Sequence, residues 1–83
     1  MIAEAIQSET LEALVSQQSV REAVVARVSR DNSKWTLSIR LGVLRARLMP
    51  VRSWREPPHT WTSLTAVGRF TEAVGIQGYS VEL

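Results

Sequence analysis

The chain has 83 residues and a net charge of +2, with 45% of its residues hydrophobic and 22% charged. This composition is typical of a folded globular domain and excludes an intrinsically disordered chain. The absence of cysteine excludes disulfide bonds, thiolate metal sites and thiol catalysis. We expect a single domain over residues 1–83, small enough that association as a homodimer would add to its stability.

No segment of the sequence is suited to a membrane. Its apolar runs are much shorter than the roughly 20 residues that cross a bilayer. The first ten residues, MIAEAIQSET, carry glutamates where an export signal would carry basic residues. We therefore expect a cytoplasmic protein that is neither membrane-inserted nor exported by that route.

Charge is unevenly distributed along the chain. Residues 1–20 contain glutamates and no basic residue, whereas residues 21–55 contain every lysine and arginine except Arg69. Such a concentration of positive charge attracts polyanions. An ordinary solvated face of a β-sheet would give the same pattern, and the sequence leaves both interpretations open.

The first predicted element is an acidic amphipathic helix over residues 2–17. Residues 19–22 then have the spacing of a helix-capping box, while residues 23–29 are rich in β-branched side chains and favour a strand. We predict the strand, because residues 31–33, Asp-Asn-Ser, then form the turn of a hairpin with the next strand.

That next strand has the clearest pattern in the chain. In KWTLSIRL, residues 34–41, Trp35, Leu37 and Ile39 alternate strictly with polar side chains. A reversal at Gly42 leads to a third strand over residues 43–49. Three consecutive strands predict an antiparallel meander with one apolar and one polar face.

The polar face of this meander is the main candidate for a binding surface. If Val24, Ala26 and Val28 lie on the apolar face, four arginines project from the other face: Arg27, Arg40, Arg45 and Arg47. The assignment depends on strand register, because a slip of one residue moves every side chain of a strand to the opposite face.

The segment VRSWREPPHTWTSL, residues 51–64, is predicted to be a loop, because Pro50 and the pair at 57–58 disfavour regular structure. In it Trp54 is flanked by Arg52 and Arg55, and these residue types recur at binding hot spots and at base-stacking sites. The alternative is that the Trp54 ring only covers the edge of the sheet.

A second helix is predicted over residues 62–74, capped by Thr62 or Ser63 and ended by Gly75, before a last strand at residues 79–83. The order α-β-β-β-α-β predicts an α+β fold with both helices against one face of a mainly antiparallel sheet. The expected core comprises Trp35, Leu37, Ile39, Leu44, Leu48, Leu64, Val67, Phe70, Val74 and Val81.

The sequence offers no catalytic or metal-binding constellation. His59 is the only histidine and has no cysteine to join it as a ligand, so we expect it to lie at the surface or to pack in a loop. No serine lies in a G-x-S-x-G elbow, and the glycines form no phosphate-binding loop. We expect a protein that is not an enzyme and needs no cofactor or metal.

Several segments resemble one family. KWTLSIRLG, the run from Val51 to Ile76 and the ending YSVEL resemble the short ParC-type partition-associated proteins of plasmids and integrating elements. Members show a W-x-L-x-V/I-R strand, an S-x-REP segment, an aromatic residue before S-L, an RF-containing helix and a closing F/Y-x-V-E/D strand. The resemblance covers residues 24–83 and places residues 55–57 at the REP position and residues 69–70 at the RF position.

The resemblance implies an accessory protein of a mobile genetic element, linked to stable inheritance. It leaves out the acidic helix, and small proteins of mobile elements also include inhibitors of host defence. We therefore expect a DNA-binding module for partition or maintenance; the alternative is a protein-binding inhibitor of the anti-CRISPR or anti-restriction type. The basic central region favours nucleic acid, while the acidic helix favours a host or plasmid protein complex as partner.

Overall fold

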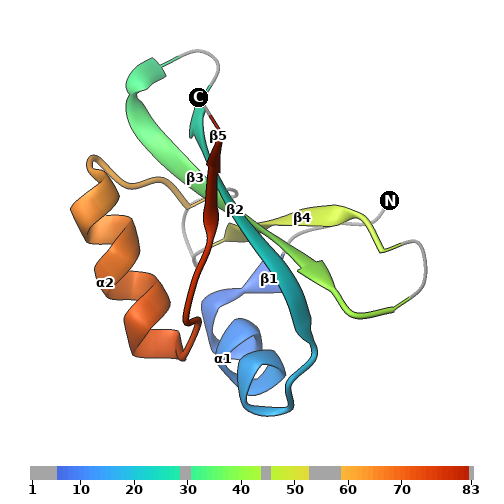
Figure 1. Cartoon of the computed structure of the whole chain (residues 1–83). Helices are drawn as coiled ribbons and strands as arrows, with labels where there is room; N and C mark the ends of the chain where they lie inside the picture. Colours follow the sequence, from blue (N-terminus) through green and yellow to red (C-terminus); the bar gives the residue numbers. More distant parts are fainter. Residues whose placement is uncertain (1–5, 29–30, 44–45, 53–58, 83) are drawn as a thin grey trace.

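The structure of the protein, a computed structural model, describes residues 6–28, 31–43, 46–52 and 59–82, with only the backbone at residues 31–33 (Figure 1). The described residues form a small α+β domain of two helices and a five-stranded sheet, in agreement with the predicted class. The elements are β1 (Ile6–Gln7), α1 (Ser8–Ser16), β2 (Val20–Val28), β3 (Asp31–Leu41), β4 (Leu48–Arg52), α2 (Leu64–Val74) and β5 (Ser80–Glu82).

The strands lie in the order β1-β4-β3-β2-β5. The central three form the predicted antiparallel meander, which confirms the choice of a strand over a helix after Ser19. The two outer strands run parallel to their neighbours, β1 beside β4 and β5 beside β2. The sheet is therefore mixed. Parallel neighbours need a long connection, and a helix lies in each one here: α1 between β1 and the meander, and α2 between the meander and β5.

The first helix is shorter than predicted. It begins at Ser8, because Ile6 and Gln7 form β1 and pair with Val51 and Arg52. Ile6 is 5% exposed and belongs to the core as part of a strand. Residues 2–5 of the predicted helix lie outside the described residues.

The second helix ends where the sequence predicts. The Ser63 side chain accepts a hydrogen bond from the backbone N–H of Ala66, which is the N-cap arrangement. Gly75 adopts the left-handed conformation, with φ 96°, and its N–H donates to the carbonyl of Glu72. These two signals fix both ends of α2 locally.

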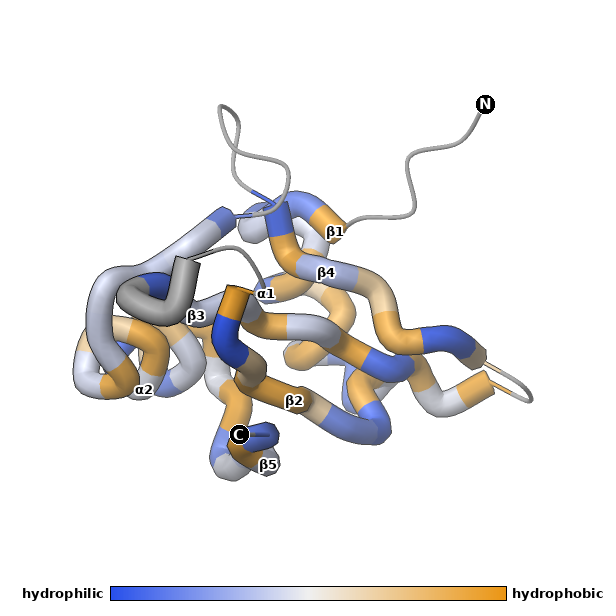
Figure 2. The backbone as a smooth tube through the Cα atoms, turned by 90° about the horizontal axis from the view of Figure 1, so that it is seen from above, coloured by the Kyte–Doolittle hydropathy of each residue, from blue (hydrophilic) through white to orange (hydrophobic). Residues whose placement is uncertain are grey.

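Both helices contribute to one core. Leu11 of α1 and Val67 of α2, each fully buried, join a cluster with the sheet face that carries Trp35, Leu37 and Ile39. We call this face the core face. Figure 2 shows the sheet seen from above, with β4 towards one margin, β5 at the other and α2 to one side.

The predicted core is partly right. Trp35, Leu37, Ile39 and Val67 are buried, and Phe70 and Val74 pack against the cluster. Three predicted members are instead exposed: Leu48 by 36%, Leu64 by 37% and Val81 by 41%. Leu44 lies outside the described residues. The core also includes residues that were not predicted, namely Ile6, Leu11, Ala23, Val25, Val51 and Trp61.

These differences arise from the faces of β2 and β4. Val25 pairs with Leu37 on the core face, and Met49 pairs with Ile39, so the predicted assignment of both strands is wrong by one residue. Each strand contains adjacent apolar residues, Val24 and Val25 in β2 and Leu48 and Met49 in β4. The sequence pattern therefore satisfies either register, and tertiary packing decides between them.

Two connections also differ from the prediction. Residues 31–33 belong to β3 and do not form the hairpin turn; the connection, residues 29–30, lies outside the described residues. The strand predicted at 43–49 is β4 at Leu48–Arg52, and it contains Pro50. Because β1 pairs with β4 only from Val51 onward, no described strand flanks Pro50 on that side, and its missing N–H is tolerated there.

Candidate interaction surface

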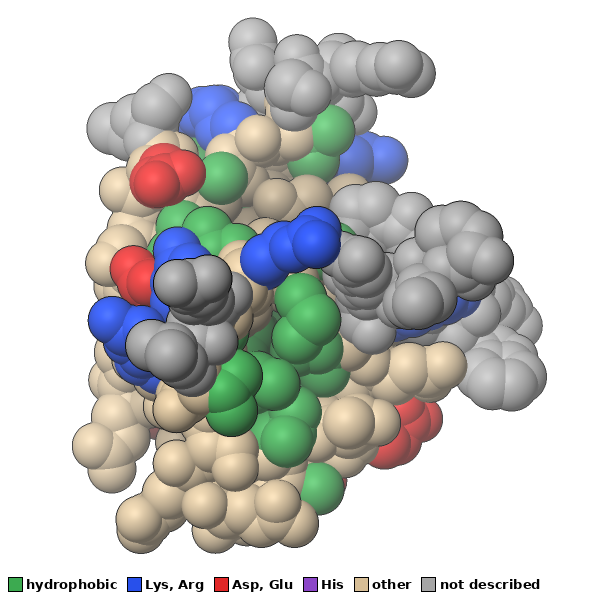
Figure 3. Space-filling model, turned by 90° about the vertical axis from the view of Figure 1, so that its right-hand side faces the viewer, with side chains coloured by type: hydrophobic (Ala, Val, Ile, Leu, Met, Phe, Trp, Pro, Cys, Tyr) green, Lys and Arg blue, Asp and Glu red, His purple; other side chains and the backbone are tan. Residues whose placement is uncertain are grey.

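The face of the sheet opposite the core face, which we call the open face, is not covered by a helix in the described part of the chain. Its side chains follow from alternation and register. They are Gln7 of β1; Leu48, Pro50 and Arg52 of β4; Lys34, Thr36, Ser38 and Arg40 of β3; Glu22, Val24 and Ala26 of β2; and Ser80 and Glu82 of β5. Figure 3 views this side and shows hydrophobic side chains from the middle of the view downward, with basic side chains above and beside them.

Arg40 lies on the open face, as predicted, but its guanidinium is engaged within the molecule. Its Nε donates to Oε1 of Glu22 on β2 at 2.9 Å, and its Nη1 donates to the carbonyl of Ala46 at 2.7 Å. The two side chains are 30% and 43% exposed. Arg40 therefore ties β3 to β2 and to the β3–β4 connection, and Glu22 offsets its charge at the surface.

Arg27 does not lie on the open face, and this part of the prediction is wrong. It pairs with Trp35, and its guanidinium carbon lies 4.5 Å from the centroid of the Trp35 ring on the core face. The geometry is that of a cation–π contact. Arg27 is on this face for the same reason that Val25 is buried: the register of β2 differs by one residue from the predicted register. The Arg27 side chain is still exposed to solvent.

The other predicted site residues are dispersed. Arg47 is exposed in the connection before β4 and lines a hollow of about 220 Å³ with Leu41, Val43 and Met49. Arg52 lies on β4, half-buried beside Gln7. Arg45, Trp54 and Arg55 lie outside the described residues. The binding role of all seven predicted residues stays a prediction.

Two residues of the open face escaped the sequence prediction. Lys34 could have been predicted from the sequence, because it lies two positions before Thr36 in the strict alternation of β3 and so shares a face with Arg40. Glu22 could not be placed in this way, because its face depends on the register of β2. Its role as the partner of Arg40 appears only when the strands are paired.

An aromatic group lies where β4 leads towards α2. The rings of His59 and Trp61 stack at 4.1 Å between centroids and 8° between planes, and Phe70 of α2 packs against Trp61 at 5.1 Å. Trp61 also exchanges backbone hydrogen bonds with Trp35. Among the residues that the structure describes, none is a hydrogen-bond partner of the buried Nδ1 of His59. The group joins the loop to the core, in keeping with the expected packing role of His59.

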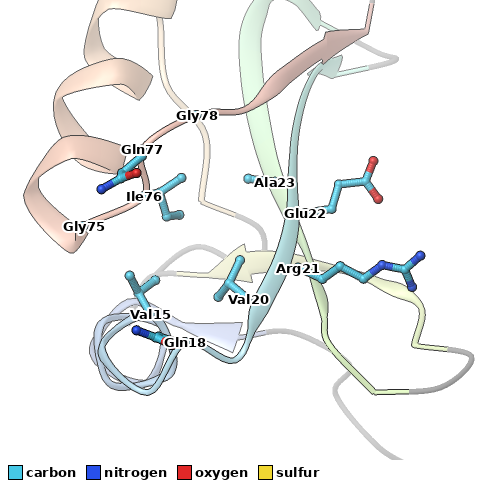
Figure 4. Close-up of a pocket in the computed structure, with 10 residues that line it drawn as sticks. All are labelled: Val15, Gln18, Val20, Arg21, Glu22, Ala23, Gly75, Ile76, Gln77 and Gly78. Carbon is cyan, nitrogen blue, oxygen red and sulfur yellow. The ribbon is translucent and has the colours of Figure 1, made fainter.

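A groove of about 420 Å³ lies between the end of α1, the start of β2 and the segment that joins α2 to β5. In Figure 4 the side chains of Val15, Val20 and Ile76 point into it, while Arg21 and Glu22 of β2 point away. The groove thus offers apolar contacts and no converging acid and base. Within the described residues, no three His, Cys, Asp or Glu side chains gather as metal ligands.

Among the described residues, neither helix is long and apolar enough to cross a membrane.

No protein family matches this chain, and no curated protein or solved structure matches it either. The resemblance to ParC-type partition-associated proteins therefore stays a prediction.

Proposed function

We propose that this is a non-enzymatic accessory protein that binds another protein through the open face of its sheet. The observation that carries the proposal is the composition of that face. Its middle row, formed by the register partners Pro50, Ser38 and Val24, carries no charged side chain. The row on one side of it holds the pair of Arg40 and Glu22, and the row on the other side ends at Glu82. An apolar centre with a polar margin is the usual anatomy of a protein–protein interface.

The state of Arg40 supports the same choice. A nucleic-acid surface uses arginines to neutralise phosphates, but the guanidinium of Arg40 already bonds to Glu22 and to a carbonyl. A carboxylate at this position also repels a phosphate backbone. Paired charges at the margin of a protein interface instead favour one orientation of the partner over others.

The biological role that fits such a surface is that of an inhibitor or adaptor protein, which binds its partner by surface complementarity. We propose a cytoplasmic protein of a mobile genetic element that binds a host or plasmid protein complex, as anti-CRISPR and anti-restriction inhibitors do. Leu48 would be an anchor in this interface, because it is a large apolar side chain of the open face, beside Arg40, that is 36% exposed.

A second candidate is a nucleic-acid-binding module for plasmid partition or maintenance. The observation that favours it is the surplus of basic side chains on the sheet: Arg21, Arg27, Lys34 and Arg52 are all at least partly exposed. If this function is correct, affinity for nucleic acid falls steeply as salt rises, and each lost phosphate contact lowers the slope by about one unit.

One experiment separates the two candidates. The parent protein, Leu48→Glu and Leu64→Glu are immobilised and exposed to bacterial lysate, and their binding to random duplex and single-stranded DNA is measured at low and high salt. Leu64 is the matched control, because it is 37% exposed but lies on α2, on the other side of the sheet.

We expect a specific protein complex that the parent and Leu64→Glu retain and Leu48→Glu loses, with no binding to DNA at low salt. Retention by Leu48→Glu and loss by Leu64→Glu would contradict the assignment of the open face. Salt-sensitive binding to DNA without any retained protein would establish the second candidate instead.

A further inference from the structure

The outer edge of the sheet at β5 is an exposed strand edge. Ser80, Val81 and Glu82 are all exposed, and no strand lies beyond them in the described part of the chain. Exposed edges present unpaired N–H and C=O groups, and proteins guard them with a short edge strand, charged side chains, proline or a bulge. β5 has three residues and carries Glu82, but it contains no lysine or proline and pairs with β2 without a register shift.

The core face stops abruptly at this edge. Leu37, Val25 and Val81 are direct register partners across β3, β2 and β5, so they form one apolar row on the core face. Leu37 and Val25 are 0% exposed, whereas Val81 is 41% exposed. Within the described part of the chain, the row is therefore covered at Leu37 and Val25 and has no further strand beyond Val81.

We propose that two copies of this chain associate through antiparallel pairing of their β5 strands, about a two-fold axis at Val81. A two-fold axis perpendicular to the sheet gives antiparallel edge strands and keeps both helix layers on the same side. This is the isologous arrangement typical of homodimers. The inference concerns only copies of this chain and does not depend on the partner of the open face.

The sequence of β5 is self-complementary in this register. Val81 faces Val81 of the second copy, which extends the apolar row through Val25 and Leu37 of each copy. Ser80 faces Glu82 of the second copy, so the carboxylate meets a hydroxyl donor and not another carboxylate. Cross-strand pairs of this kind stabilise a sheet, whereas like charges directly opposite destabilise it.

The first test places charge on the two-fold axis. Val81→Lys and Val81→Glu each put two like charges opposite one another in the dimer, so we expect each variant to weaken association by about tenfold or more. An equimolar mixture sets lysine against glutamate and restores the dimer. The matched control is Val43, an apolar residue of the β3–β4 connection that is 62% exposed, changed to lysine and to glutamate.

Analytical ultracentrifugation from low to high micromolar concentration gives the readout, and circular dichroism establishes that each variant is folded. We expect a dimer for the parent and the Val43 variants, monomers for each Val81 variant alone, and a heterodimer in the mixture. A monomeric parent, a dimer that the Val81 changes leave intact, or folded variants that stay monomeric when mixed would overturn the proposal.

A second test fixes the register. The chain has no cysteine, so Ser80→Cys and Glu82→Cys introduce single thiols. Mixed under mild oxidation, the two variants should cross-link to each other, because directly opposite residues lie within reach of a disulfide. Each variant alone should cross-link much less, since its thiols are then offset along the strands. Equal cross-linking in all three samples would contradict the register.

Discussion

Replacing Gly75 with alanine should destabilise the protein by a predictable amount. Gly75 ends α2 with φ 96° and ψ 10°, a conformation that disfavours L-residues by about 1 to 2 kcal/mol. A Cβ at this position would lie 3.1 Å from Cγ1 of Val15 on α1, so the two helices would have to move slightly apart. Reduced entropy of the unfolded chain offsets less than about 1 kcal/mol of this cost.

We therefore expect Gly75→Ala to lower the free energy of unfolding by about 1 to 2 kcal/mol. In a domain of this size, each kcal/mol lost lowers Tm by about 4–8 °C. Urea denaturation followed by tryptophan fluorescence measures the change. The double variant with Val15→Ala removes the steric part and leaves the backbone part, so it should recover only some of the loss. Asparagine at position 75 should cost less than alanine, because it tolerates the left-handed region.

The matched control is Gly78, where an added Cβ meets no atom within 4 Å and φ is outside the left-handed region. Gly78→Ala should be neutral or slightly stabilising. Equal losses at both glycines, or a Gly75→Ala variant as stable as the parent, would refute the argument that backbone conformation at the end of α2 determines the effect.

Three further substitutions test the packing. Ser63→Ala removes the N-cap hydrogen bond and should lower the free energy of unfolding, measured by thermal denaturation, by about 1 kcal/mol. An unchanged Tm would show that the cap is dispensable. Leu37→Ala removes a side chain that is 0% exposed and should lower the free energy of unfolding by about 2–5 kcal/mol. Phe70→Ala should lower it by less than the about 3–5 kcal/mol expected for a fully buried ring, because Phe70 is only partly buried. A larger loss for Phe70→Ala than for Leu37→Ala would place Phe70 in the centre of the core. Arg27→Ala should cost about 0.5–1 kcal/mol and alter the emission of Trp35, and an identical spectrum would argue against the contact.

The sequence predicted those elements whose signals are local. β3 alternates strictly through Trp35, Leu37 and Ile39, so only one face could be apolar. The ends of α2 depend on Ser63 and Gly75, whose side-chain oxygen and backbone freedom act within one helical turn. The pattern allowed one apolar face for β3 and one C-terminal residue for α2, and the structure confirms both; of the two predicted caps, Thr62 and Ser63, the structure has Ser63.

The rest of the fold depends on contacts that the local sequence does not encode. β1 has only two residues, and its strand character comes from pairing with the distant β4. The candidate surface was predicted only in part for a related reason. Arg40 follows the unambiguous β3 and was placed correctly, whereas Arg27 follows β2, in which Val24 and Val25 allow either face.

The two parallel outer strands have a consequence for the order in which the chain folds. The meander from β2 to β4 joins neighbours in sequence, so its contacts close short loops. β1 with β4, and β5 with β2, join residues from distant parts of the chain and close long loops at a larger entropic cost. Amide hydrogens in the centre of β3 should therefore exchange most slowly, and those of β1 and β5 should open first, well before the domain unfolds as a whole.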